Sequence, residues 1–166
     1  HGLPDVIHAM CTVPAGWACT QVGPSLSRRV VITENTGPFP LVIWIHGGAW
    51  RSGSKENPPL GLLGYGYALA SIDFSLSTAK IFPAQVHEIK AAVRFLRANA
   101  NKYGFQSGKI IIWGSSSGGH LAALVATTNN HKELEGDIGN YTSTSSSVQG
   151  CIDYFGPTNF LTILNQ

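Results

Sequence analysis

Residues 110–118 have the types and spacing of a serine nucleophile site. The sequence reads Gly114-x-Ser116-x-Gly118, between an apolar run over 110–113 and a helical apolar pattern over 121–125. A serine hydroxyl is a weak nucleophile, so it must stand exposed on a sharp, strained turn where a base can reach it, and glycines beside it tolerate the crowding. The helix directs its N-terminal N–H groups at the reacting centre. The pattern predicts a nucleophilic Ser116.

A second glycine-rich turn follows another apolar run. Residues 41–45 are apolar throughout, which is typical of a parallel strand buried on both faces, and His46-Gly47-Gly48 follows directly. Acyl transfer through a tetrahedral oxyanion needs N–H donors held about 3 Å from the developing charge. A glycine-rich turn after a strand can direct backbone amides in this way, and the residue after the nucleophile, Ser117, normally supplies another donor. The two motifs together indicate an oxyanion site.

Four segments carry a family resemblance. They read His46-Gly47-Gly48-Ala49-Trp50-Arg51-Ser52-Gly53, Ile72-Asp73-Phe74-Ser75-Leu76-Ser77, Phe82-Pro83-Ala84-Gln85, and Trp113-Gly114-Ser115-Ser116-Ser117-Gly118-Gly119-His120-Leu121-Ala122. On these residues the chain resembles the α/β-hydrolase superfamily, in the lipase and esterase branch with an HGG motif. It is most similar to small bacterial esterases of the feruloyl- or acetyl-xylan-esterase type, also called BD-FAE-like, from about residue 35 to 160.

The resemblance implies a carboxylic ester hydrolase that acts through an acyl-enzyme on short-chain or aromatic acyl esters. It implies Ser116 as the nucleophile, Gly48, Ala49 and Ser117 as the oxyanion donors, and a small-molecule ester as the substrate. It also implies no metal and no organic cofactor. Asp73 stands where this family holds loops together, although Ser75 replaces the usual arginine nearby.

The acid and the base of a catalytic triad are the difficult part of the prediction. In this superfamily they follow the serine in the order acid, then histidine, but only 50 residues follow Ser116. We therefore expect the usual acid and histidine to be absent, as in a chain truncated before them. Asp153 is a candidate acid, and His131 is a candidate base in a rearranged loop. His120 lies on the helix after the nucleophile, so we expect it to pack against loops.

Strands alternate with helices along the chain. This order predicts a single, incomplete α/β domain over 1–166, a three-layer α/β/α hydrolase fold with an open, mostly parallel sheet whose C-terminal strands are missing. Expected strands cover 29–33, 41–45, 67–75, 109–113 and 148–155; expected helices cover 60–68, 83–101 and 118–127.

The N-terminal segment 1–29 has no clear period and is the least interpretable part. The chain has three cysteines. Cys11 and Cys19 could form a disulfide in an oxidising compartment, whereas Cys151 lies in an apolar strand and is expected to be inert core. Neither a CxxC motif nor a Cys/His metal spacing occurs.

Composition restricts the partners. Charged residues make up 12% of the chain and the net charge is only +2, without a basic run, so we do not expect nucleic acid to bind. No apolar stretch reaches the roughly 18 residues that span a bilayer, so we expect a soluble protein, in the cytoplasm or secreted. An open edge at strand 148–155 predicts a homo-oligomer, because such edges pair with other chains.

Three functions stay open on the sequence. The first is the serine ester hydrolase. The second is a catalytically impaired hydrolase fragment that acts as a binding or self-associating module, which a serine-directed phosphonate would distinguish by failing to label it. The third keeps the mechanism but changes the substrate, as in an arylformamidase or a peptidase of the same superfamily, and a comparison of amides with esters would separate it.

Overall fold

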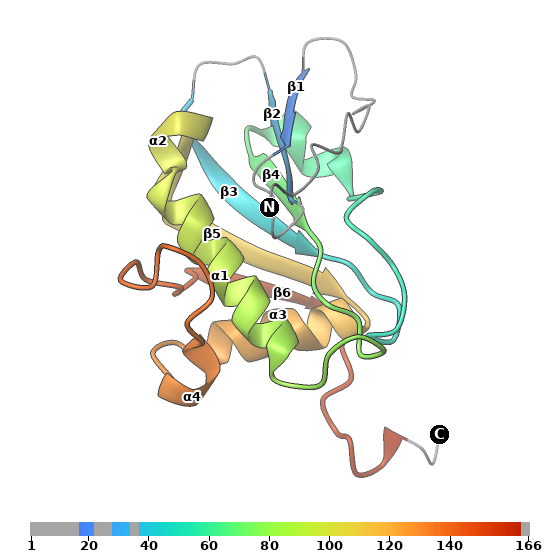
Figure 1. Cartoon of the computed structure of the whole chain (residues 1–166). Helices are drawn as coiled ribbons and strands as arrows, with labels where there is room; N and C mark the ends of the chain where they lie inside the picture. The colour runs from blue at the N-terminus through green and yellow to red at the C-terminus, as the bar shows by residue number, and fades with distance from the viewer. Residues whose placement is uncertain (1–16, 22–27, 34–36, 164–166) are drawn as a thin grey trace, which may run out of the picture.

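A six-stranded sheet is the centre of the molecule in a computed structural model, which describes residues 17–21, 28–33 and 37–163 (Figure 1). The spatial order is β1-β2-β4-β3-β5-β6. β1 and β2 run antiparallel to their neighbours, and the other four strands are parallel to one another. The strands are β1 (Trp17–Gln21), β2 (Arg28–Thr33), β3 (Phe39–Ile45), β4 (Ala68–Ile72), β5 (Phe105–Ser115) and β6 (Gly150–Tyr154).

Helices cover both faces of this sheet. On one face α1 (Ala84–Ala98) and α3 (Ser117–Thr127) pack side by side, and the short α2 (Ala100–Tyr103) and α4 (Lys132–Glu135) follow them in the chain. On the other face lies the 3₁₀ helix η1 (Leu60–Tyr65). The predicted three-layer α/β/α arrangement with an open, mostly parallel sheet is therefore confirmed.

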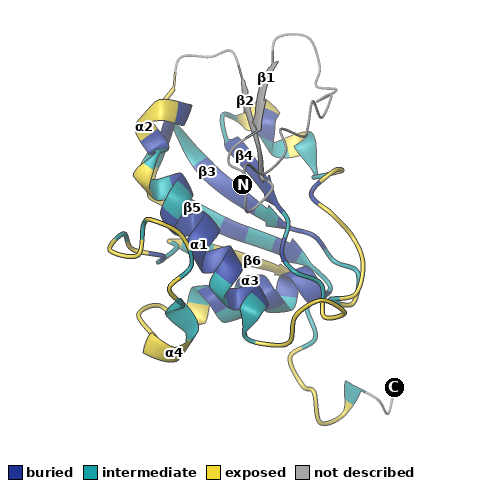
Figure 2. Cartoon of the chain, viewed as in Figure 1, coloured by how far each residue is buried: buried dark blue, intermediate teal, exposed yellow. Residues whose placement is uncertain are grey.

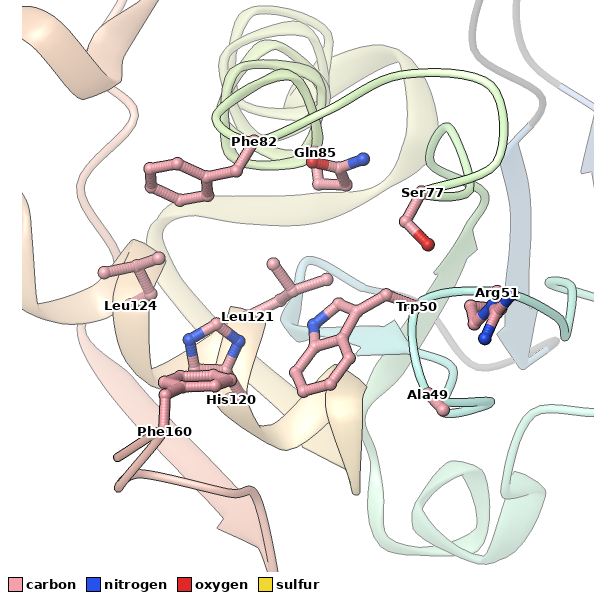
Figure 3. A pocket seen from close by; sticks show the side chains of 10 residues that line it. All are labelled: Ala49, Trp50, Arg51, Ser77, Phe82, Gln85, His120, Leu121, Leu124 and Phe160. Carbon is pink, nitrogen blue, oxygen red and sulfur yellow. The ribbon is translucent and has the colours of Figure 1, made fainter. Parts of the chain in front are cut away.

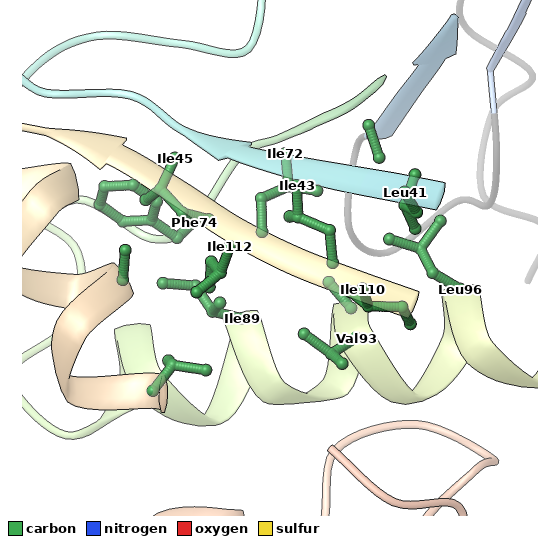
Figure 4. Packing of buried hydrophobic residues seen from close by; sticks show 14 of the residues in the cluster. Leu41, Ile43, Ile45, Ile72, Phe74, Ile89, Val93, Leu96, Ile110 and Ile112 are labelled. Carbon is green, nitrogen blue, oxygen red and sulfur yellow. The ribbon is translucent and has the colours of Figure 1, made fainter. Parts of the chain in front are cut away.

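The core explains why the central strands are apolar throughout. Successive side chains of a strand point to opposite faces. Leu41, Ile43 and Ile45 of β3 face α1 and are fully buried, as Figure 4 shows, while Val42 packs with Leu63 of η1 on the other face. Figure 2 shows the contrast with the periphery, where α4 carries exposed residues. Burial on both faces therefore requires a continuous apolar run.

The parallel register brings three strand ends to one edge of the sheet. Ile45, the last residue of β3, pairs with Gly114, and Ser115, the last residue of β5, pairs with Tyr154 at the end of β6. Loops that follow these strands must therefore lie next to one another. In open α/β sheets this carboxyl edge is where ligands bind.

The observed elements differ from the predicted ones in a few places. The helix expected over 60–68 is the 3₁₀ helix η1, and three of the residues it was to contain are glycines, which weaken an α-helix. The helix expected over 83–101 is divided into α1 and α2 at Asn99. Neither β1 nor the short helix α4 was predicted.

The cysteine predictions have different outcomes. Cys151 is exposed, so the expectation that it is inert core was wrong. The physical reason is that β6 forms the edge of the sheet among the described residues, and none of them lies beyond it. Cys11 and the side chain of Cys19 lie outside the described residues, and so does the predicted disulfide between them.

Buried cations of α1 hold the segment that follows α3. Lys90 and Arg94 are almost completely buried, and both contact Glu135 of α4, at 2.7 Å and 3.4 Å between the charged atoms. Lys90 also donates to the carbonyl of Thr128, and Arg94 to the carbonyl of Ile138. The segment between α3 and β6 is therefore anchored to α1 through the Glu135 carboxylate and through backbone carbonyls.

None of the helices in the described residues is long and apolar enough to cross a membrane.

Candidate active site

Ser116 forms the turn between β5 and α3. Its backbone has φ 54° and ψ −125°, in a region that residues other than glycine rarely adopt. Its N–H donates to the carbonyl of Tyr154 at 2.9 Å, and its carbonyl accepts from the N–H of His120 at 3.1 Å. The strand, strained turn and helix that the motif predicts are all present, and these two hydrogen bonds stabilise the strained backbone of Ser116.

The two glycines of the motif are required by close backbone approach. A Cβ atom on Gly114 would collide with the carbonyl of Gly118 across the turn. A Cβ atom on Gly118 would collide with the carbonyl of Ile45 at the end of β3. The turn is therefore tight both within itself and against the neighbouring strand.

The loop after β3 lies against Ser116. Gly48, Ala49 and Trp50 have φ values of 116°, 52° and 59°, three consecutive residues in the left-handed region. A Cβ atom on Gly47 would lie 3.3 Å from the Cβ of Ser116. Among the described residues the N–H groups of Gly48 and Ala49 donate no hydrogen bond. They are free to bind an oxyanion.

A buried histidine fixes the start of this loop. His46 is 5% exposed and stacks on Phe74 with 4.5 Å between ring centroids. Its Nδ1 donates to the carbonyl of Gly47 at 2.8 Å. Since Gly47 also lies against the serine turn, the ring positions the backbone of the loop after β3.

An ion pair fixes the end of the same loop. The backbone N–H of Lys55 donates to Asp73 Oδ1 at 2.6 Å, and its Nζ donates to Oδ2 at 2.9 Å. Ser71 Oγ donates to the carbonyl of Lys55 at 2.8 Å. Asp73 does hold loops together, as the resemblance implied. The sequence analysis missed Lys55, because nothing in a polar loop marks one lysine as buried.

Asp153 lies at the same edge of the sheet as Ser116. It pairs with Gly114 in the register of β5 and β6, and its Oδ1 accepts from the N–H of Gly156 at 2.8 Å. A Cβ atom on Gly119 would collide with this carboxylate, which therefore lies over the first turn of α3. Asp153 is exposed, and among the described residues no hydrogen bond joins it to Ser116.

His120 is a packing residue. Its ring lies edge-on to Trp50 and to Phe160, at 5.4 Å and 4.9 Å between centroids. Its Nδ1 is buried without a hydrogen-bond partner in the described part of the chain. Burial lowers the pKa of His120, and the nearby Asp153 carboxylate only partly offsets this effect. The neutral imidazole fits its aromatic surroundings.

The structure does not bring His131 to Ser116. His131 is exposed and precedes α4, beyond the C-terminal end of α3, whereas Ser116 precedes its N-terminal end. An α-helix rises about 1.5 Å per residue, so this helix of 11 residues separates the two side chains by its full length.

Two cavities meet at the loop after β3. The first, of about 610 Å³, is lined by both Ser116 and Ser117 and by the segment after β6. The second, of about 720 Å³, lies between the start of α1 and the start of α3 (Figure 3). Ala49 and Trp50 line both cavities. In the described residues no group of three or more His, Cys, Asp or Glu side chains is placed to hold a metal ion.

Comparison with known proteins decides the family. The BD-FAE family model matches residues 31–166. The chain belongs to the BD-FAE family. Its sequence is also similar to Esterase LipC of Mycobacterium tuberculosis, with 32% identity over 125 residues, which cover 73% of this chain and 30% of LipC. The match to this chain thus spans less than a third of the length of LipC.

Solved structures agree on the fold. A protein described as a bifunctional GH43-CE from Bacteroides eggerthii superposes with a TM-score of 0.79 and 36% identity, over 84% of this BD-FAE chain and 20% of that protein. A truncated form of a carbohydrate esterase from gut microbiota superposes with a TM-score of 0.78 and 35% identity, over 84% of this chain and 54% of that one. The turn at Ser116 and the loop at Gly48 thus lie within a domain similar to esterases.

Proposed function

We propose that this BD-FAE chain provides the nucleophile and the oxyanion hole of a carboxylic ester hydrolase that acts on short-chain or aromatic acyl esters. The observation that carries the proposal is the position of Ser116, on a strained turn in a cavity shared with Ala49 and Ser117. The esterase names of the relatives support it. The carbohydrate esterase among the solved structures supports an ester whose alcohol is a polyhydroxylated compound.

The reaction follows from this arrangement. Ser116 Oγ attacks the carbonyl carbon and gives its proton to a base, while the carbonyl oxygen becomes an oxyanion. The N–H groups of Gly48, Ala49 and Ser117 stabilise that charge. Collapse of the tetrahedral intermediate breaks the C–O bond, and the protonated alcohol leaves. Water then attacks the acyl-enzyme by the same steps, releasing the acid and restoring Ser116.

The base is the component that the described residues do not supply. No hydrogen bond joins Ser116 Oγ to a histidine among them, and His131 lies at the far end of α3. Asp153, at the carboxyl edge next to the serine turn, is our candidate acid. Because a serine without its base loses several orders of magnitude in rate, we expect slow turnover from this chain by itself.

A fluorophosphonate probe and a nitrophenyl ester together test the proposal. Because the described residues supply no base, we expect the 166-residue chain to be labelled covalently but slowly, over a long incubation. Ser116→Ala should lose the label, while the matched variant Ser115→Ala keeps it. Hydrolysis of nitrophenyl acetate is expected to follow the same order, at a low rate. No label on the folded wild-type chain would contradict the proposal and favour the alternative, a binding or self-associating module. Faster cleavage of anilides than of esters would indicate an amide-directed relative.

We also propose that the chain forms a homo-oligomer through the edge of β6, with which no other strand in the described part of the chain pairs on that side. Ile152 and Tyr154 of this strand are 42% and 59% exposed, and Phe155 directly after it is 69% exposed. An exposed apolar edge with unpaired backbone groups is a template for pairing with another chain. These observations support self-association, which the whole-molecule prediction below tests.

A further inference from the structure

The larger cavity adjoins the one that holds Ser116. It lies on the other side of the Ala49 and Trp50 wall, and Ser116 does not line it. Figure 3 shows Phe82, Gln85 and Ser77 on one side of the cavity, across from the side chains of α3 and Trp50. Its volume of about 720 Å³ exceeds what an acetyl group alone would fill.

The two cavities differ in the chemistry of their walls. The larger one is bounded mainly by aromatic and aliphatic side chains, which are those of Trp50, Phe82, Leu121, Leu124 and Phe160. The smaller one has a more mixed wall, with the polar side chains of Ser116, Thr158, Asn159 and Thr162 beside the apolar ones of Phe155 and Ile163. An apolar group gains free energy in the first cavity, and a polar group finds hydrogen-bond partners in the second.

Trp50 separates the two cavities and is held in an uncommon conformation. Its φ of 59° is unfavourable for a bulky side chain. The indole contacts the rings of His120 and Phe160, which lie on α3 and on the segment after β6. Strained backbone persists where its surroundings fix it, and it is frequent at ligand sites. The indole therefore lies between the two cavities, and a substrate bound at Ser116 reaches the larger cavity by extending past it.

We infer that the larger cavity binds the acyl group of the ester and that the smaller one binds its polar alcohol. This inference rests on the proposed ester hydrolysis at Ser116. The carbonyl carbon of an ester at Ser116 carries the acyl chain on one side and the alcohol oxygen on the other. The mainly apolar wall beyond Trp50 suits the acyl chain. The acyl group is therefore apolar and larger than acetyl, and Leu124 and Phe82 limit its size.

Neutral carboxamides test the cavity without any chemistry. Butanamide, hexanamide and octanamide keep the carbonyl and the acyl chain but need no base to bind. We expect the affinity, measured by titration with NMR detection, to rise about fourfold per added methylene. Leu124→Trp, which fills the cavity, should remove this dependence on chain length. The matched variant Leu62→Trp lies within η1 on the opposite face of the sheet and should keep this dependence.

A second variant guards against misfolding. Phe82 is 58% exposed, so Phe82→Ala should fold normally and lower the affinity for octanamide at least threefold. Equal affinities for the three amides in the wild-type chain would overturn the inference, and so would an unchanged length dependence in a folded Leu124→Trp. Binding of the amides needs no reaction at Ser116. Failure of phosphonate labelling with intact length dependence would therefore contradict only the ester hydrolysis.

Discussion

At the residue scale, the site depends on positions where only one residue type fits. Ser116 is strained, and it is held by hydrogen bonds to Tyr154 and His120. Gly118 has to be glycine because the backbone of Ile45 occupies the space of a Cβ atom. The loop after β3 is fixed at one end by the buried His46 and at the other by Lys55 and Asp73. The candidate N–H donors of Gly48 and Ala49 are therefore positioned by close packing and by hydrogen bonds at both ends of their loop.

Gly118→Ala tests this close approach. The added methyl group forces β3 and the serine turn apart, so we expect a loss of about 1–3 kcal/mol in the free energy of unfolding, together with loss of phosphonate labelling. Gly108→Ala is the control, because a Cβ atom there meets no atom within 4 Å. Thermal and chemical denaturation measure both variants. Equal stability of the two variants would show that the turn can widen without cost.

At the element scale, α1 anchors the loops on either side of the candidate site. Glu88, near its N-terminus, accepts from the N–H and Oγ of Ser75 and from Lys80, which fixes the loop that carries Ser77 and Phe82 to the larger cavity. The buried Lys90 and Arg94 hold the segment after α3 through Glu135. One amphipathic helix thus orders two long connections by contacts to carboxylates and carbonyls.

Glu135→Gln tests the anchor at the second of these connections. Burial of the Glu135 carboxyl opposes its ionisation, but hydrogen bonds from Lys90 and Ser146 outweigh burial and lower its pKa from the ordinary value of 4.5. A carboxyl with a lowered pKa stabilises the fold above its unfolded pKa, and this contribution is lost as the pH falls through the folded pKa. The variant also leaves two buried cations without their carboxylate, so we expect a loss of about 3 kcal/mol at pH 7.

The pH dependence separates this ion pair from a general effect of charge removal. Melting temperatures of the wild type should fall from about pH 5 downward, and Glu135→Gln should show a smaller fall over the same range. Glu133→Gln is the control, because Glu133 is exposed on the same short helix. An identical pH profile for the wild type and Glu135→Gln would show that ionisation of Glu135 does not contribute to stability at acidic pH.

At the scale of the whole molecule, β6 leaves one edge of the sheet unpaired among the residues that the structure describes. We expect the chain to be a dimer or larger in light scattering after size-exclusion chromatography at micromolar concentration. Ile152→Lys should give a monomer, because a charge on an edge strand opposes pairing. Ile81→Lys is the matched control, since Ile81 is 82% exposed but lies before α1. A monomeric wild type, or equal oligomers in both variants, would contradict self-association through β6.

The sequence by itself determined the features that depend on neighbours in the chain. Apolar runs over 41–45 and 110–113 became β3 and the centre of β5, and the motif around Ser116 became a strained strand-to-helix turn. These patterns work because burial on two faces and a tight turn restrict residue types locally. The family also followed from these motifs, and the BD-FAE model confirms it.

Only the tertiary structure decided which distant residues meet. It buried Lys55 against Asp73, placed His131 at the far end of α3, and exposed Cys151 on an edge strand. It also opened a second cavity behind Trp50, from residues of four separate segments. None of these results follows from local sequence, because burial and contact at each position depend on which remote strand or helix packs beside it.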